Sequence, residues 1–150
     1  MTASLAPAQV SVVQRRSVRT LSVDISEHAC RTWGHECRDI ATWRPEQVFD
    51  LVVCHSVLQY LDDDAATAAI EHLALATGAV LYLEAPTADD FDHVVDPDRT
   101  DMPDNPDTTV HRRSGDWYRE RLRPWFQQVG AGLWVRRGTV PMFELEAAAE

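Results

Sequence analysis

The sequence predicts an α/β fold in which helices cover a mostly parallel sheet and a C-terminal antiparallel hairpin completes it. Its 150 residues are enough for one domain with a core of ordinary size. Short apolar runs alternate with amphipathic helical segments, which is the element order of a layered α/β fold. Two runs, 49–55 and 79–84, stay apolar without alternation, as strands covered on both faces of a parallel sheet do.

The first elements with a clear pattern are a strand, a helix and a second strand. Apolar and polar residues alternate from Val18 to Ile25, as in a strand. Ser26 is a good N-cap for a short helix over 27–33, and Gly34 stands where a C-terminal glycine is usual. Residues 35–40 predict the second short strand.

The centre of the chain predicts a buried strand, a helix and another buried strand. The first strand is the run 49–55. The acids of 62–64 supply an N-cap and first-turn charge for a helix over 63–77, which Gly78 ends. Its apolar face follows i, i+3, i+4 spacing and consists of Ala66, Ala69, Ile70, Leu73 and Ala74. Residues 79–84 form the second strand.

The C-terminal third predicts a long loop, a helix and a hairpin. Residues 86–110 are rich in Asp and Pro and have the length of a lid or a disordered segment. A helix face follows, which Pro124 is expected to kink or restart. Its apolar positions are Tyr118, Leu122, Trp125, Phe126 and Val129. The segments 133–137 and 140–146 flank Gly138-Thr139, which is a hairpin pattern.

Composition limits the partners and the chemistry. The formal net charge of -10 argues against a nucleic-acid or anionic-membrane partner, because phosphate binding needs concentrated positive charge. No apolar run approaches the roughly 20 residues of a membrane span. Small-molecule or protein partners are therefore favoured. All 14 basic residues are arginine, which excludes lysine Schiff-base chemistry. Three cysteines without a disulfide spacing fit a reducing cytosol, so we expect a cytoplasmic location.

Candidate site residues follow the predicted strands, because ligands of an open parallel sheet bind beyond the carboxyl ends of its strands. The residues at these ends are Asp24, Asp39, His55 and Glu84. An acid such as Asp24 can accept both hydroxyls of a ribose. An ordinary strand-end or turn aspartate is the alternative.

Four runs together resemble the class I S-adenosylmethionine-dependent methyltransferases. They are Val23-Asp24-Ile25-Ser26, Cys37-Arg38-Asp39-Ile40, the continuous run from Phe49 to Asp63, and Gly78-Ala79-Val80-Leu81-Tyr82-Leu83-Glu84. The resemblance covers 18–146, between a poorly defined segment, 1–17, and a frayed tail, 147–150. Its most specific part is the run from Phe49 to Asp63.

The resemblance implies a Rossmann-like sheet of seven strands, the last one antiparallel, and S-adenosylmethionine as the cofactor. Asp24, beside Ile25, would hold the ribose hydroxyls. Asp39 would meet the adenine amino group, with Ile40 packing on the ring. Cys54, His55 and Ser56 would border the methionine end and the transferred methyl group.

The chain departs from the family at its amino end. Family members open with a central strand and a glycine-rich loop, whereas residues 1–23 contain no glycine. The apolar stretch Val10 to Val13 is about four residues from the next strand, so the two could pair only as a hairpin. We therefore expect an N-terminally truncated fold in which 1–17 holds what remains of the first helix. A second copy, a partner chain or nothing would fill the gap. Gly130-Ala131-Gly132 is expected to be a turn.

The expected activity is methyl transfer to a small-molecule acceptor, with oxygen, nitrogen and carbon acceptors all open. His55 and His111 are the candidates for proton transfer, and a structural role for each is the alternative. The lid, 86–110, would determine which acceptor binds. The alternative function is a catalytically degenerate binding or regulatory subunit that needs a partner chain.

No metal site is expected. His28-x-Cys30 and His35-x-Cys37 could indicate zinc, but residues two apart on a helix point away from each other. The Asp-rich lid lacks the central glycine and closing glutamate of a calcium loop.

Overall fold

The chain is a mixed α/β protein that divides into two compact units, Met1–Cys37 and Arg38–Glu150. The computed structural model describes residues 19–93 and 110–139. The predictions made for 1–17, for most of the lid, for the hairpin arm 140–146 and for the tail lie outside the described residues.

The first unit consists of two short parallel strands joined by a helix. β1 (Val23–Asp24) pairs with β2 (Glu36–Cys37), and α1 (Glu27–Trp33) connects them. The predicted helix is confirmed together with both of its ends. Ser26 Oγ accepts a hydrogen bond from Ala29 N at 3.3 Å, and Gly34 has a φ of 74° at the C-cap.

Both strands of this unit are shorter than predicted. The alternation over 18–25 pairs only at Val23 and Asp24, because β2 offers just two partner residues. The predicted strand over 35–40 stops at Cys37. Asp39 begins a turn instead, since its Oδ1 accepts a hydrogen bond from Ala41 N at 2.9 Å.

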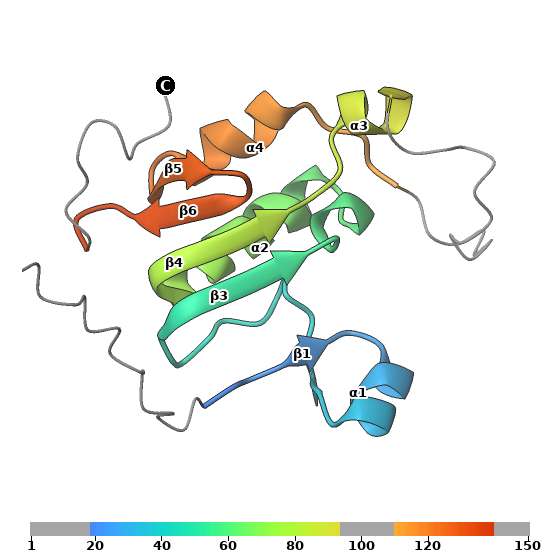
Figure 1. The fold of residues 1–150 in the computed structure, drawn as a ribbon. Coiled ribbons are helices and arrows are strands. Elements are labelled where there is room, and N and C mark those ends of the chain that lie inside the picture. The colour runs from blue at the N-terminus through green and yellow to red at the C-terminus, as the bar shows by residue number, and fades with distance from the viewer. Residues whose placement is uncertain (1–18, 94–109, 140–150) are drawn as a thin grey trace, which may run out of the picture. The chain divides into compact units, whose positions relative to one another are not determined.

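The second unit contains a four-stranded mixed sheet. Its strands are β3 (Phe49–His55), β4 (Thr77–Glu84), β5 (Phe126–Gly130) and β6 (Leu133–Arg136), in the order β3-β4-β6-β5. β3 and β4 are parallel, whereas β6 runs antiparallel to both β4 and β5 (Figure 1). Three strands therefore share one direction and β6 opposes them.

Four helical segments accompany this sheet. They are the short 3-10 helix η1 (Leu58–Tyr60), α2 (Asp63–Ala76), α3 (Ala88–His93) and α4 (Gly115–Leu122). Asp62 caps α2 through a 2.8 Å hydrogen bond from Ala65 N. The helix ends two residues before Gly78, because Thr77 already begins β4 and its Oγ1 donates to the carbonyl oxygen of Leu73. α3 lies in a segment that the sequence predicted to be loop.

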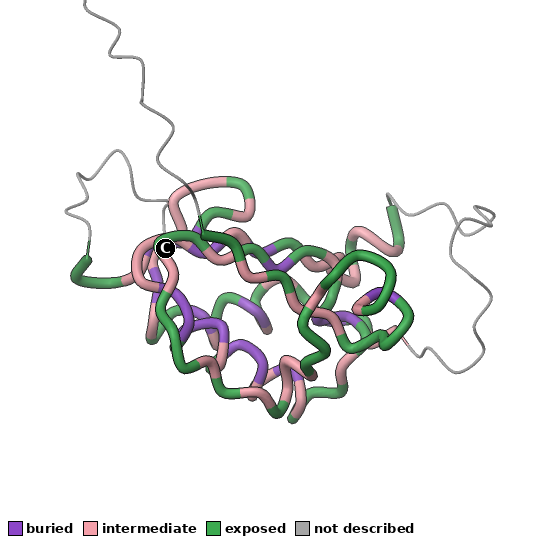
Figure 2. The backbone as a smooth tube through the Cα atoms, turned by 90° about the horizontal axis from the view of Figure 1, so that it is seen from below, coloured by how far each residue is buried: buried purple, intermediate pink, exposed green. Residues whose placement is uncertain are grey.

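One apolar core lies between the sheet and the helices α2 and α4. Its buried members are Cys54, Leu58, Ala69, Ile70, Leu73, Ala74, Leu81, Leu83, Tyr118, Leu122, Phe126 and Trp134. All apolar positions predicted for α2 are buried there or beside it. Figure 2 marks the buried positions along the backbone. Closely packed side chains of this kind supply most of the free energy of folding.

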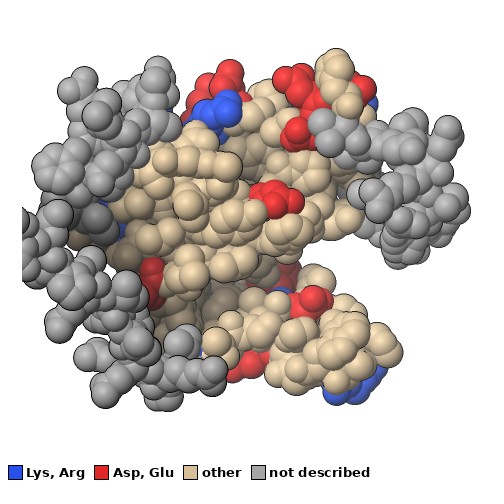
Figure 3. All heavy atoms as spheres, viewed as in Figure 1, with Lys and Arg blue, Asp and Glu red and all other residues tan. Residues whose placement is uncertain are grey.

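Among the described residues of the second unit, no helix covers the opposite face of the sheet, so the prediction that β3 is buried on both faces is wrong. Leu51 and Val53 are 57% and 61% exposed, although they belong to the uninterrupted apolar run. Their neighbours on β4 are Val80 and Tyr82, which are half-buried. Figure 3 shows this face as largely uncharged. The apolar run was typical of two-sided burial, but α2 and α4 both pack on one side.

The predicted helix through Val129 is also wrong. α4 ends at Leu122, and residues 126–130 form β5. Pro124 cannot continue the helix, because it lacks an N–H and its ring clashes with the preceding turn. Phe126 then reaches the core from a strand.

A hairpin that the sequence did not predict joins β5 and β6, and the prediction that Gly130 to Gly132 is a turn is confirmed. The second arm of the predicted hairpin, 140–146, lies outside the described residues. Gly132 has a φ of 71°, and a Cβ there would lie 2.9 Å from Tyr82 Cε2. Only glycine fits this turn without a shift of β4.

Candidate functional site

His55 and Glu84 meet at the carboxyl ends of the parallel strands β3 and β4. The two residues are register partners, and His55 Nε2 lies 3.0 Å from Glu84 Oε1. A carboxylate can only accept a hydrogen bond, so Nε2 carries the proton. In the neutral ring Nδ1 is then a proton acceptor. Both side chains are about half exposed, so a ligand can reach them from solvent.

Tyr82 completes this cluster from the same face of β4. Its hydroxyl donates a 2.8 Å hydrogen bond to Glu84 Oε2. This bond raises the pKa of Tyr82, and desolvation and the charge of Glu84 add to the increase. The phenol therefore stays protonated and holds the second oxygen of Glu84. We name His55, Glu84 and Tyr82 the strand-end cluster.

Ser56 shapes the turn that leaves β3 beside this cluster. Its φ of 54° is the only positive value among the described non-glycine residues. Its N–H donates to the carbonyl oxygen of Glu84 at 2.8 Å, which holds the turn against β4. A strained backbone is often found at a functional site, because the surrounding structure has to maintain it.

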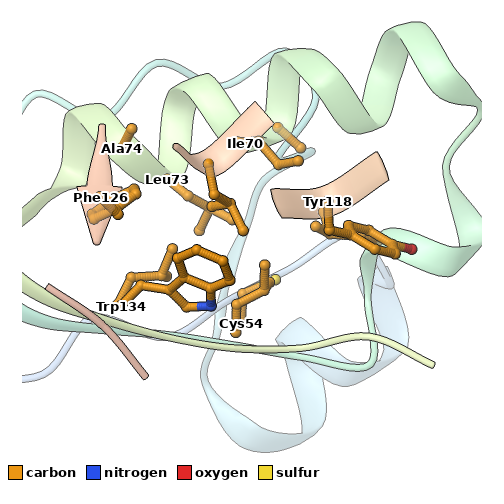
Figure 4. Packing of buried hydrophobic residues seen from close by; sticks show 12 residues of the cluster. Cys54, Ile70, Leu73, Ala74, Tyr118, Phe126 and Trp134 are labelled. Carbon is orange, nitrogen blue, oxygen red and sulfur yellow. The ribbon is translucent and has the colours of Figure 1, made fainter. Parts of the chain in front are cut away.

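Cys54 points into the core rather than toward the strand-end cluster. It packs with Leu73 and Trp134 between the sheet and α2 (Figure 4). Burial raises the pKa of its thiol to about 12, so the thiol is neutral at physiological pH. Only the main chain of Cys54 can border a ligand at the end of β3.

His111 lies on the segment that leads from the predicted lid into α4. Its N–H donates to the carbonyl oxygen of Gln59 in η1 at 2.8 Å. Two residues later, Arg113 is buried and anchors the segment to the start of α2 through a 2.7 Å bond to Asp63. The segment is therefore fixed near the turn that follows β3. No local pattern indicates the burial of Arg113, because this burial depends on contacts between segments that are distant in the chain.

Asp24 and Ile25 lie at the carboxyl end of β1, in the first unit. Asp24 Oδ1 accepts a 2.7 Å hydrogen bond from Ser26 N, which fixes the carboxylate over the start of α1. No described residue donates to Oδ2, and Ile25 is 68% exposed. A carboxylate with one committed oxygen and one open oxygen can bind a hydroxyl group.

Asp39 and Ile40 belong to a turn of the second unit. The carbonyl oxygen of Asp39 accepts hydrogen bonds from Thr42 N and Trp43 N. Ile40 packs partly against the core, and its carbonyl oxygen lies 2.9 Å from His72 Nδ1, which therefore carries a proton. Part of the Ile40 side chain is left to contact a ligand.

The structure brings His55 and Ser56 together with Glu84, and it holds His111 to the turn beyond them. The sequence missed Tyr82, although its spacing of two from Glu84 on a strand indicates a shared face. Within the described ranges no group of three or more potential metal ligands could hold an ion. No helix in those ranges has the length and apolar character to cross a membrane.

Replacing Glu84 by glutamine is expected to lower the pKa of Tyr82, because the variant removes the negative charge beside the phenol and weakens its acceptor. The measurement is the ultraviolet absorbance of tyrosinate during an alkaline titration. Tyr82→Phe is the control, since subtracting its titration from that of the native chain isolates Tyr82. An unchanged Tyr82 titration in Glu84→Gln would contradict the hydrogen bond.

Comparison of the chain with protein-family models, with curated proteins and with solved structures finds no match to any of them.

Proposed function

We propose that this chain is a methyltransferase-like domain with a Rossmann-like sheet, which uses S-adenosylmethionine to methylate a small-molecule acceptor. The observation that carries the proposal is the direction of its strands. β3, β4 and β5 run the same way and only the last described strand, β6, opposes them. The methyltransferase family that the sequence resembles also has an antiparallel last strand. The parallel β1-α1-β2 unit also places Asp24 at the end of a strand.

Within its own unit, each residue that the resemblance assigns to the cofactor has groups suited to the part of the cofactor it would contact. Asp24 offers an open carboxylate oxygen to a ribose hydroxyl. Asp39 and the half-buried Ile40 offer a polar and an apolar contact, as an adenine ring requires. Ser56 and the main chain of Cys54 would border the methionine end.

The strand-end cluster supplies the proton chemistry. When bound, S-adenosylmethionine provides a methyl group that is transferred by direct displacement at its carbon. His55 Nδ1 would take a proton from the acceptor, while Glu84 holds Nε2–H and balances the positive charge of the ring. Tyr82 fixes the carboxylate in this orientation. His111 is the second candidate base, held to η1 by its main chain.

Binding of S-adenosylhomocysteine tests this proposal. Calorimetric titration of the chain is expected to show an affinity in the low-to-mid micromolar range. Asp24→Asn should weaken it by about tenfold or more, because asparagine can keep the bond to Ser26 N but loses the charge. Glu27→Gln is the matched control in the same unit, where this exposed acid pairs with Arg31. This variant should bind as the native chain does.

Absence of binding would contradict the enzyme proposal. If the chain also forms a defined oligomer or copurifies with a partner, the result favours the catalytically degenerate subunit. The absence of glycine from residues 1–23 is the sequence observation behind this second function. Among the described residues, β3 pairs with β4 alone, so its other edge could receive a strand from a second copy or a partner.

A further inference from the structure

The thiols of Cys30 and Cys37 converge on one turn of the first unit. Cys30, on α1, donates from Sγ to the carbonyl oxygen of Asp24 at 3.3 Å. Cys37, on β2, donates from Sγ to the carbonyl oxygen of Ile25 at 3.6 Å. These carbonyl groups belong to consecutive residues, and Cys37 is the register partner of Asp24. Both sulfur atoms therefore lie against the same short segment of main chain.

The two thiols also interact with each other. The pKa of Cys30 is raised, first by desolvation and then by a hydrogen bond with Cys37 and by the negative charge that Cys37 can acquire. Cys30 is partly exposed, and Cys37 is exposed, so both can meet a dissolved oxidant. Cys54, the third cysteine, is buried in the core of the second unit.

We propose that Cys30 and Cys37 are a redox-sensitive pair that a peroxide oxidises to a disulfide. In the first step the exposed Cys37, as its thiolate, attacks one oxygen of hydrogen peroxide. An S–O bond forms, the O–O bond breaks, and the departing hydroxide takes up a proton to become water. The sulfur of Cys37 is oxidised to a sulfenic acid and the peroxide is reduced.

In the second step Cys30 resolves this sulfenic acid. Its sulfur attacks the sulfur of Cys37, an S–S bond forms and the S–O bond breaks. The departing hydroxide takes the proton that Cys30 gives up, so a second water leaves. Two thiols and one hydrogen peroxide thus yield one disulfide and two waters. A dithiol reductant reverses the reaction by thiol–disulfide exchange.

Oxidation removes both S–H donors from the carbonyl oxygens of Asp24 and Ile25. The backbone that carries Asp24 therefore loses two of its restraints. A lower affinity for S-adenosylhomocysteine after oxidation would follow, and this consequence rests on the proposed function. Formation of the disulfide does not depend on the proposed function.

Thiol counting and peptide mapping of the full chain test the pair. Hydrogen peroxide, in the presence of a metal chelator, is expected to reduce the thiols titrated after denaturation from three to one. Trypsin cleaves after arginine, so the disulfide should link the peptides 20–31 and 32–38. A link to Cys54, a disulfide between two chains, or three surviving thiols would overturn the proposal.

Two variants separate the pair from general thiol oxidation. Cys54→Ser should lose both of its remaining thiols to the same linked peptides. Cys37→Ser should form no intrachain link, because Cys30 has lost its partner and Cys54 is buried. A Cys37→Ser chain that still formed an intrachain disulfide would exclude the pair. Calorimetry of the oxidised native chain then tests cofactor binding separately.

Discussion

Replacing Arg113 by methionine is expected to lower the free energy of unfolding by about 2–4 kcal/mol. The guanidinium donates from Nη1 to the carbonyl oxygen of Leu58 at 2.9 Å and from Nη2 to that of Leu61. It also pairs with Asp63 and lies 4.6 Å from the ring centroid of Trp117. Methionine keeps the apolar stem but leaves the two carbonyl oxygens without this donor. Urea unfolding monitored by circular dichroism measures the change.

Arg112→Met is the matched control. Arg112 is the neighbour of Arg113 in the chain, but its guanidinium is half exposed. Arg112 pairs with Asp92 and lies 5.6 Å from the ring centroid of Phe91, both near the surface. An exposed ion pair contributes at most about 1 kcal/mol, so this variant should unfold nearly as the native chain does. Equal destabilisation by both substitutions would contradict the anchoring role of Arg113.

The folded chain is expected to lose stability at alkaline pH through ionisation of Cys54. Burial raises the pKa of this thiol from 9.0 to about 12 in the folded state. A group whose folded pKa is raised stabilises the fold fully below its unfolded pKa, and that stabilisation is lost as the pH rises through the folded value. The loss therefore begins near pH 9 and ends near pH 12. It amounts to about 4 kcal/mol at most.

Cys54→Ala should remove this part of the pH dependence. The variant is less stable than the native chain at neutral pH by about 1 kcal/mol, because a small cavity replaces the sulfur. From about pH 9 to about pH 12 its free energy of unfolding should fall less steeply than that of the native chain. Urea unfolding under reducing conditions at each pH gives the two slopes.

Leu83→Ala is the control for the alkaline measurement, because it also shortens a buried side chain of the core but removes no titratable group. This variant should keep the native slope. Ionisation of Tyr82, whose pKa is also raised, contributes to the slopes of all three chains and cancels in their differences. Parallel slopes for Cys54→Ala and the native chain would mean that the buried thiol does not set the alkaline limit.

Local signals located most of the elements. The caps Ser26 and Asp62 identified the starts of α1 and α2, because a side chain that accepts from a nearby backbone N–H is specified within a few residues. The apolar run 49–55 identified β3 in full. His55 and Glu84 became candidates because each ends a predicted strand, and ligands of a parallel sheet bind beyond the carboxyl ends of its strands.

Other features depended on contacts between distant residues. The spacing of Phe126 and Val129 predicted a helix face. The same spacing is also compatible with a strand that begins after Pro124. Pairing with β6 makes this segment a strand. The exposure of Leu51 and Val53 depends on which sheet face α2 and α4 cover, and a run of apolar residues contains no information on that.

The sequence by itself determined the α/β class, the positions of the main helices and strands, and the strand-end residues Asp24, His55 and Glu84. These follow from periodicity and capping, which act over a few residues. Only the tertiary structure decided that Tyr82 and His55 share Glu84, and that Cys30 and Cys37 meet over one turn. Such contacts depend on strand register and helix docking, which join residues that no local pattern relates.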